Sequence, residues 1–346
     1  MSRWAVVLAG GVGSRFWPVS TPERPKQLLP LVTNEPMLAA TLRRLQPLAP
    51  PKHTLVLTNA ALTAAVRSLA PDLPPRNVIA EPRPAGTAAA LAWAADTVAR
   101  SDSRDAVMIC VHADWAIGDE PGFRDALERA ARAADKHRAL VTIGIVPTRP
   151  DPGFGYIQPG EMVHGEDQLR RVARFVEKPD RSRAEAMVRE GYLWNSGIFA
   201  WRAGDFLDEL RAHTPEVAPA LDMAAGDATR FFAEVQPIAV DVGVLERSSR
   251  VMMLPGDFKW DDVGTWAALG RVRARDAQEN AVNGSVFVHE GARNVVHAAS
   301  GTVVLYGVSD LVVVTREGLT LVTTREHSAD LKRLIEALPP EMRAPE

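Results

Sequence analysis

A glycine-rich loop flanked by fixed positive charges lies near the start of the chain. An apolar run at residues 4–9 leads into Gly10, Gly11 and Gly13. Because glycine has no Cβ, the backbone N–H groups of such a loop can approach phosphates closely. Arg15 and Lys26 add positive charge where phosphoryl transfer concentrates negative charge. The segment therefore predicts a nucleoside triphosphate site.

The spacing excludes two common phosphate loops. A P-loop needs Gly-x-x-x-x-Gly-Lys-Ser/Thr, which residues 10–17 do not supply. A dinucleotide fingerprint needs Gly-x-Gly-x-x-Gly, and Phe16 stands where the third glycine belongs. What remains is Leu-x-Gly-Gly-x-Gly-x-Arg at residues 8–15, followed by Pro25-Lys26-Gln27.

This signature resembles that of the sugar-1-phosphate nucleotidyltransferases. With Phe16-Trp17-Pro18 and Pro25-Lys26-Gln27 it is most similar to the mannose-1-phosphate guanylyltransferase branch, the GDP-mannose pyrophosphorylases. The resemblance covers roughly residues 4–338. It implies that Arg15 and Lys26 are catalytic. It also implies nucleotide binding by the loop residues Leu8, Gly10, Gly11, Gly13 and Ser14.

Two aspartates match the metal ligands of this family. Asp114 lies in His-Ala-Asp-Trp, where the family has Pro-Ala-Asp-His or Pro-Ser-Asp-His. Asp262 lies in Trp-Asp-Asp-Val-Gly-Thr-Trp, which matches the family's Trp-x-Asp-Val-Gly-x-Trp. Mg²⁺ prefers carboxylate oxygens together with substrate phosphates. The resemblance therefore implies Mg²⁺ as the cofactor, held by Asp114 and Asp262, with Asp261 as a solvated neighbour.

Three further segments match the sugar side of the family, at residues 153–157, 175–179 and 194–197. In Phe-Val-Glu-Lys-Pro at residues 175–179, the resemblance implies that Glu177 holds sugar hydroxyls. Lys178 would be catalytic, binding the phosphate of the sugar 1-phosphate. Trp-Asn-Ser-Gly at residues 194–197 supplies an asparagine side chain that can both donate and accept. The implied sugar-binding residues are Gly155, Glu177, Asn195 and Gly197.

Two weaker matches concern the base and one more carboxylate. Residues 81–90 occupy the place of the family's Glu-Pro…Arg-Asn-Thr-Ala-Pro-Ala, with Ala85 and Gly86 where Arg and Asn stand. Asp241 lies in a segment similar to the family's Ile-Asp-x-x-x-x-Glu. It is a candidate to contact the sugar or to make a structural polar contact. The resemblance implies that the base and ribose lie against Glu81, Pro82, Gly86 and Thr87.

Bulk composition narrows the class of protein. The formal charge of −3 and the lack of a basic run argue against nucleic acid or an anionic membrane as a partner. No run approaches the roughly 18 continuous apolar residues of a transmembrane helix. The start lacks a signal-peptide layout, and Cys110 is the only cysteine, so we expect a cytoplasmic enzyme without disulfides. At this length we expect no fused isomerase domain, which some relatives carry.

Apolar strands alternate with amphipathic helices up to about residue 150. This pattern predicts an α/β domain with a doubly wound, mixed but mostly parallel, Rossmann-like sheet over residues 1–265. A linking helix is expected within 266–282. Five short Val-rich runs between Gly284 and Thr324 predict a small all-β module at 283–346, closed by a helix at 328–338. The resemblance implies a short left-handed β-helix here, and a small meander sheet is the alternative.

The expected reaction is transfer of GMP from GTP to α-D-mannose 1-phosphate, with release of pyrophosphate. The sugar phosphate would attack the α-phosphorus in line, assisted by Mg²⁺. The expected partners are GTP and mannose 1-phosphate, and a homodimer is a possible assembly. Two alternatives stay open: another sugar-1-phosphate nucleotidyltransferase that uses UTP or dTTP, and a non-catalytic paralogue that only binds sugar nucleotide.

Overall fold

The computed structural model describes residues 2–11 and 14–343. The chain forms two compact units that do not follow chain order. The first unit comprises residues 1–10, 42–113 and 119–258, and the second comprises 11–41, 114–118 and 259–346. The residues that follow the glycine loop therefore belong to the same unit as the carboxy-terminal strands. The domain boundaries at 265 and 282 stay a prediction.

The first unit is built on a nine-stranded sheet with the order β3-β2-β1-β4-β9-β6-β10-β8-β7. Near-continuous apolar runs form its central strands, as expected for strands covered on both faces. The strands are β1 (Arg3–Leu8), β2 (Thr54–Asn59), β3 (Val78–Glu81), β4 (Val107–His112), β6 (Leu140–Ile145), β7 (Tyr156–Met162), β8 (Arg170–Val176), β9 (Leu193–Arg202) and β10 (Val251–Gly256).

The sheet is less parallel than the sequence predicts. Strands β3, β2, β1 and β4 pair in parallel, as the strand–helix alternation indicates. Beyond them, β9 is antiparallel to β4, β6 and β7, and β8 is antiparallel to β7 and β10. Strand β10 is parallel to β6, but β9 lies between β4 and β6 and runs antiparallel to both. Strands β7 and β8 form an antiparallel pair joined by a short connection, so no crossover helix separates them. The prediction of a Rossmann-like α/β fold is confirmed, and that of a mostly parallel sheet is wrong.

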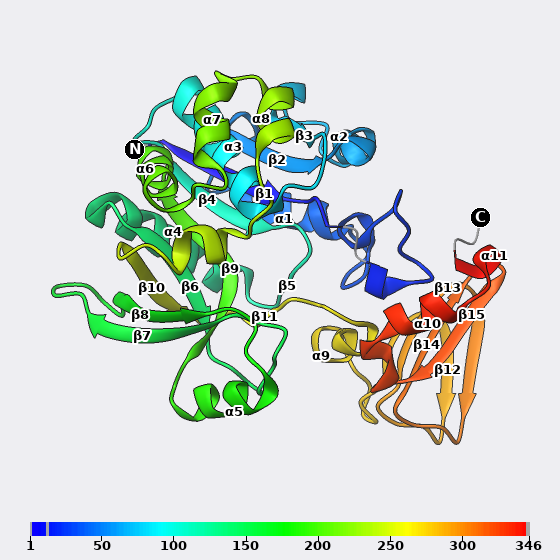
Figure 1. Cartoon of the computed structure of the whole chain (residues 1–346). Helices are drawn as coiled ribbons and strands as arrows, with labels where there is room; N and C mark the ends of the chain where they lie inside the picture. The colour runs from blue at the N-terminus through cyan, green and yellow to red at the C-terminus, as the bar shows by residue number, and fades with distance from the viewer. Residues whose placement is uncertain (1, 12–13, 344–346) are drawn as a thin grey trace. The chain divides into compact units, whose positions relative to one another are not determined.

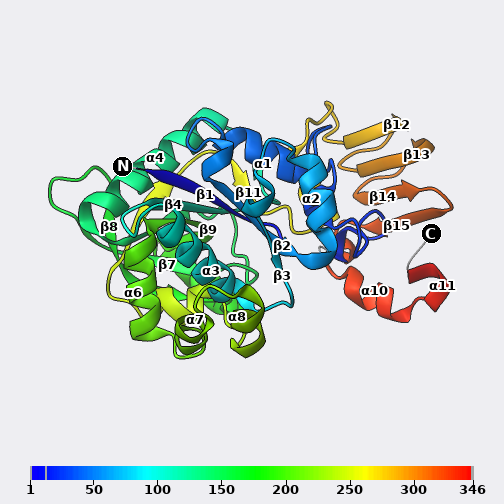
Figure 2. The same ribbon diagram turned by 90° about the horizontal axis from the view of Figure 1, so that it is seen from above.

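Helices cover both faces of this sheet. Helix α4 lies on one face, whereas α3, α6, α7 and α8 lie on the other (Figure 2). Helix α3 presents a run of buried alanines to the core, which lets its backbone approach the sheet closely. The helices of the first unit are α2 (Thr63–Leu69), α3 (Gly86–Ser101), α4 (Glu120–His137), α5 (Arg181–Arg189), α6 (Ala203–His213), α7 (Ala218–Ala224) and α8 (Ala228–Glu234). Helix α1 (Met37–Leu45) contains the unit boundary.

The second unit contains a four-stranded sheet in the order β12-β13-β14-β15 (Figure 1). Its strands are β12 (Ala281–His289), β13 (Val295–Tyr306), β14 (Leu311–Arg316) and β15 (Leu319–Thr324). A short pair, β5 (Ala116–Ile117) with β11 (Trp260–Asp261), also belongs to this unit. Its helices are α9 (Leu269–Val272), α10 (Leu331–Ala337) and α11 (Pro340–Arg343).

The all-β module is present, but its details differ from the expectation. Two of the five predicted runs, 294–297 and 302–306, fall largely within the single strand β13. Strands β12, β13 and β14 pair in parallel, whereas β15 pairs antiparallel to β14. The sheet is therefore mixed, and a left-handed β-helix is not confirmed. In the region of the expected linking helix, helical turns cover only Trp266–Ala268 and Leu269–Val272.

The core of the second unit joins the segment after the glycine loop to the carboxy-terminal strands. Phe16 and Trp17 pack in one buried cluster with Trp266, Val295 and Val312. The Trp266 indole N–H also donates to the Trp17 carbonyl at 2.9 Å. The three-residue helix Ser14–Phe16, which carries Arg15, is thereby held by the β-module. Leu29, which follows the three-residue helix Lys26–Leu28, lies in the same cluster.

Across residues 2–11 and 14–343, none of the helices combines the length and apolar character that crossing a bilayer requires.

Candidate active site

The glycine loop begins where β1 ends. Leu8 is buried at the end of the strand, and Gly10 and Gly11 are exposed. A Cβ built on Gly11 would meet no described protein atom within 4 Å, so packing against the described chain does not explain the glycine. The Gln27 side chain donates to the Gly11 carbonyl at 2.9 Å and fixes this end of the loop. Gly13 lies outside the described residues, as does the side chain of Ser14.

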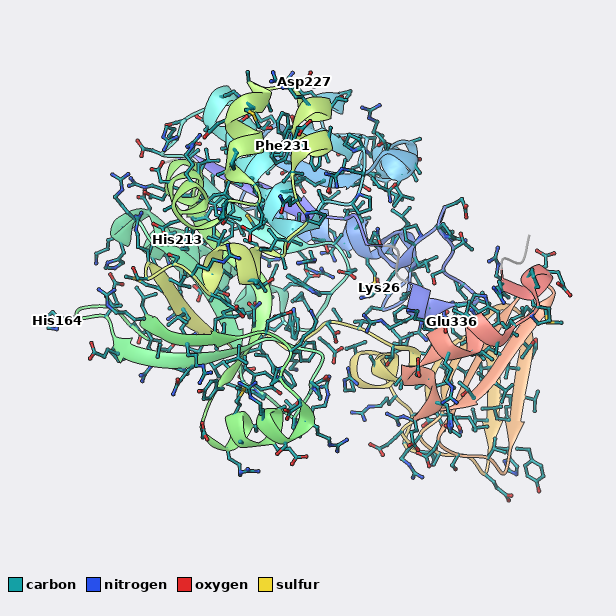
Figure 3. The ribbon with its side chains drawn as sticks, viewed as in Figure 1. Lys26, His164, His213, Asp227, Phe231 and Glu336 are labelled. Atoms are coloured by element: carbon teal, nitrogen blue, oxygen red, sulfur yellow. The ribbon has the colours of Figure 1, made fainter. Side chains whose placement is uncertain are left out.

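A cluster of opposite charges forms around Lys26 in the second unit. The Lys26 ammonium, labelled in Figure 3, donates to Asp114 Oδ2 at 3.0 Å and to the Asp262 carbonyl at 2.6 Å. The Lys26 side chain is 6% exposed, whereas that of Asp114 is 35% exposed. Burial of an ammonium requires such partners. The two aspartates that the sequence singles out are therefore brought to one lysine from segments far apart in the chain.

Arg15 joins this cluster from the exposed side. A Cβ built on Gly264 would come within 2.7 Å of Asp262 Oδ2 and 3.4 Å of Arg15 Nη1. Glycine at this position therefore leaves room for both side chains. The second unit thus places together Arg15, Lys26, Asp114 and Asp262.

The aspartate next to Asp262 has a different surrounding from the one the sequence predicts. Asp261 is 9% exposed, accepts from the Arg271 guanidinium at 2.7 and 3.0 Å, and accepts from the Val263 N–H at 2.9 Å. The prediction that it is a solvated neighbour is wrong. Val263 has a φ of 48°, which is rare for a β-branched residue, and its buried side chain helps to hold this turn. Asp261 and Val263 therefore shape the loop that presents Asp262.

The chemistry of the donor set fits a hard divalent cation. Asp114 and Asp262 offer carboxylate oxygens beside a positively charged lysine and arginine. Within the described part of the chain, no group of three or more His, Cys, Asp or Glu side chains could by itself hold a metal. Two carboxylates suit Mg²⁺, which commonly completes its coordination with substrate phosphates and water.

The first unit brings the predicted sugar-side residues together. Glu177 and Lys178 follow β8, and the Lys178 ammonium donates to Glu177 Oε1 at 2.5 Å. Lys178 has a φ of 44°, and its side chain is 65% exposed. A Cβ built on Gly155 would lie 2.6 Å from Glu177 Oε2 and 3.4 Å from Asn195 Cβ. Glycine at 155 therefore allows this carboxylate and Asn195 to approach the loop backbone.

Asn195 is held by several hydrogen bonds on β9. Its Oδ1 accepts from the Gly197 N–H at 3.2 Å, and Gly197 has a φ of 75° at an irregularity in the strand. Its Nδ2 donates to Asp241 Oδ1 at 2.7 Å. Trp194 and Phe199 are buried, as core packing predicts. Asp241, the weaker candidate from the sequence, thus contacts a predicted sugar-binding residue directly.

Two carboxyl groups of the first unit have raised pKa values. Burial raises the pKa of Glu81, at the end of β3, to about 7. Glu81 Oε1 lies 3.6 Å from a Cβ built on Gly10, so this carboxyl group lies beside the glycine loop. Burial, followed by the nearby Glu177 carboxylate, raises the pKa of Asp241 to about 6. Shifted carboxyl groups of this kind are common at functional sites.

The remaining nucleotide-side candidates lie at the start of α3. Pro82 is exposed, and Gly86 has a φ of 79° with its Cα against the Ile238 carbonyl, where a Cβ would come within 2.3 Å. The Thr87 hydroxyl accepts from the Val240 N–H at 2.9 Å. The Gly86 and Thr87 contacts therefore fix the helix start to the chain that leads into Asp241. Whether these residues also contact a nucleotide stays a prediction.

The fold, together with the clustered candidate residues for phosphate and metal binding, indicates the class of protein. Residues 4–279 match the family model described as nucleotidyl transferase, and the chain belongs to this family.

The relatives are more specific. The chain is 36% identical to a mannose-1-phosphate guanylyltransferase of Klebsiella pneumoniae over 351 residues, covering 98% of this chain and 74% of the relative. It is 37% identical to an enzyme of the same name from Escherichia coli K12 over 350 residues, covering 97% of this chain and 73% of the relative. A crystal structure from Thermus thermophilus, named mannose-1-phosphate geranyltransferase, superposes with a TM-score of 0.91. It is 34% identical and covers 97% of this chain and 99% of its own.

Proposed function

We propose that this enzyme transfers GMP from GTP to α-D-mannose 1-phosphate, giving GDP-mannose and pyrophosphate. The observation that carries the proposal is the joint presence of the charged cluster and the sugar-side cluster in a chain similar over nearly its whole length to mannose-1-phosphate guanylyltransferases. The reaction needs no covalent enzyme intermediate, so positioning and charge stabilisation supply the catalysis.

The second unit would hold the triphosphate. Arg15 and Lys26 would balance charge on the phosphates while the bond between the α- and β-phosphates of GTP breaks and pyrophosphate leaves. Asp114 and Asp262 would hold Mg²⁺. When bound, this ion would neutralise phosphate charge and fix the orientation of the phosphates. The Lys26–Asp114 contact is consistent with this assignment, because the phosphates that Lys26 would bind would also contact the Mg²⁺ held by Asp114.

The first unit would hold the sugar phosphate. Lys178 is an exposed cation at this site and would bind the phosphate whose oxygen attacks the α-phosphorus. Glu177 would accept hydrogen bonds from sugar hydroxyls, as its position against Gly155 allows. The carboxylate repels the phosphate end and the ammonium attracts it, so the pair would orient the substrate.

The proposal is tested by product identification. Purified protein is incubated with GTP, mannose 1-phosphate and Mg²⁺, and nucleotide sugar and pyrophosphate are both quantified. We expect GDP-mannose and pyrophosphate in equal amounts, with neither formed when one substrate is omitted. Binding of GDP-mannose without any turnover would instead support the non-catalytic alternative.

A further inference from the structure

Asp241 lies at the sugar-side cluster, although the role proposed above for this cluster does not use it. It begins the π-helical turn Asp241–Leu245 and accepts a 2.7 Å hydrogen bond from Asn195 Nδ2. The preceding residue, Val240, donates its N–H to the Thr87 hydroxyl, which anchors the start of the turn to α3. The backbone at Asp241 is thus anchored, and this fixes the position from which its carboxyl group reaches Asn195.

The hydrogen bonds around Asn195 define which way its amide points. Oδ1 accepts from the Gly197 N–H at 3.2 Å, and the Thr142 hydroxyl lies 3.4 Å from the same oxygen. A backbone N–H can only donate and an ionised carboxylate can only accept, so the amide oxygen faces Gly197 and the amide nitrogen faces Asp241. With its oxygen engaged by the protein, Asn195 keeps one N–H for a ligand.

We propose that Asp241 is a positioning residue of the sugar subsite, where it holds the Asn195 amide so that Asn195 serves a sugar hydroxyl as a donor. This inference rests on the proposed function. It narrows the sequence interpretation, in which Asn195 both donates and accepts. A hydroxyl that receives the Asn195 N–H must give its own proton to another acceptor, and the Glu177 carboxylate beside Gly155 is such an acceptor. The subsite therefore suits a sugar hydroxyl that accepts from Asn195 and donates to Glu177.

The charges around Asp241 support this role. The Glu177 carboxylate disfavours its ionisation, whereas the Asn195 hydrogen bond and the Lys178 ammonium favour it. Burial and Glu177 prevail and raise the pKa of Asp241 to about 6, so the group is ionised at pH 7 and becomes protonated in mild acid. Protonation removes the obligate acceptor that orients Asn195.

The experiment measures binding of mannose 1-phosphate by calorimetry, together with KM values for both substrates. The variants are Asp241→Ala, Asp241→Asn, Asn195→Ala and the double variant Asp241→Ala/Asn195→Ala. Asp227→Asn is the matched control, because Asp227 caps α8 through the Thr229 N–H at 2.9 Å in the same unit (Figure 3). It reports the effect of losing a structural aspartate.

We expect Asp241→Ala to weaken the Kd for mannose 1-phosphate about 10- to 100-fold, as for loss of a charge-assisted hydrogen bond, with KM for GTP within about twofold. Asp241→Asn retains an acceptor for Asn195 and should bind better than Asp241→Ala. Below pH 6 its affinity should also decline less than that of wild type, because the titration of Asp241 is removed while that of the ligand's phosphate, with a second pKa of about 6, remains. Because Asp241 acts through Asn195, the double variant should bind no more weakly than the worse single variant.

A Kd for Asp241→Ala within twofold of wild type, or fully additive losses in the double variant, would overturn the proposal. Failure of the proposed function is distinguishable. If wild type binds a different sugar 1-phosphate, the same variants are measured with that ligand, and the same losses support the role of Asp241. If wild type binds none of the sugar 1-phosphates tested, both proposals fall.

Discussion

Lys26 and Asp114 form an ion pair, with the ammonium 3.0 Å from Asp114 Oδ2 and 2.6 Å from the Asp262 carbonyl. The contact joins segments 88 and 236 residues apart in the chain. A buried ammonium between two candidate metal ligands places the phosphate-type and metal-type residues in one cluster. The role of a residue in this cluster can be tested by comparing its variant with a variant of a nearby residue outside the cluster.

Arg15→Ala should lower kcat by about 10²–10³, the usual result of losing one donor that stabilises charge in the transition state. Arg15 is exposed, so the melting temperature should stay near that of wild type. Steady-state pyrophosphate release measures the effect. Arg24→Ala, an exposed arginine in the same segment, is the control and should retain wild-type kcat. Equal turnover by the two variants would remove Arg15 from the mechanism.

Asp262→Asn should abolish Mg²⁺-dependent turnover while changing the free energy of unfolding by no more than about 1 kcal/mol. Substitution of the neighbouring residue, Asp261, should give the opposite result. Asp261→Asn weakens the Arg271 ion pair and should cost about 1–3 kcal/mol of stability, with the Mg²⁺ dependence retained. Titration of activity with Mg²⁺ and urea unfolding separate the two. A stable, active Asp262→Asn variant with unchanged metal dependence would make Asp262 structural only.

The residues of the charged cluster could be selected from the sequence, but their arrangement could not. Gly-x-Gly spacing, Arg15 and Lys26 are local signals, and so are the motifs around Asp114 and Asp262. The burial of Asp261 depends on Arg271, which lies 10 residues away on another turn, so its sequence position gave no sign of it. Likewise the Asn195–Asp241 contact spans 46 residues, and only the fold brings the pair together.

The KM for GTP should rise as pH falls through about 7. Burial raises the pKa of Glu81 to about 7, so the carboxylate that would accept guanine N–H groups becomes protonated below this pH. KM for GTP is measured between pH 6 and 8.5 at saturating mannose 1-phosphate. The Glu81→Gln variant should bind GTP more weakly, and its KM for GTP should no longer rise as pH falls through about 7. An unchanged step in this variant would assign the titration to another group.

Stability of the second unit should fall in mild acid. Burial, followed by the Arg273 cation, lowers the pKa of His297 to about 4. The unfolded chain takes up this proton near pH 6.5, and the folded chain only near 4. The neutral, buried His297 therefore leaves the free energy of unfolding unreduced above pH 6.5. This free energy falls by roughly 3 kcal/mol as pH falls toward 4.

Urea unfolding of His297→Asn at pH 7 and 4.5 measures this contribution. Asparagine keeps an acceptor for Arg273, which contacts His297 Nδ1 at 3.0 Å, and it does not titrate. The variant should lose less stability on acidification than wild type. His164→Asn alters an exposed histidine and should behave as wild type (Figure 3). Equal acid sensitivity of all three proteins would contradict the assignment.

The carboxy-terminal strands show where sequence patterns reach their limit. The Val-rich runs correctly predicted an all-β module, because strand propensity and glycine turns are local. Its role as the packing partner of Phe16 and Trp17 could not be read from the sequence, since burial in a shared core depends on contacts about 280 or more residues apart. The module therefore supports the segment that carries Arg15 and Lys26.

The most direct test of the central claim compares kcat/KM for GTP, ATP, UTP and dTTP with mannose 1-phosphate as acceptor. We predict that GTP is preferred. Discrimination should be modest, because Ala85 and Gly86 offer no polar side chain, and one missing base contact costs about 1–3 kcal/mol. A tenfold or greater preference for UTP or dTTP would contradict the guanylyltransferase assignment.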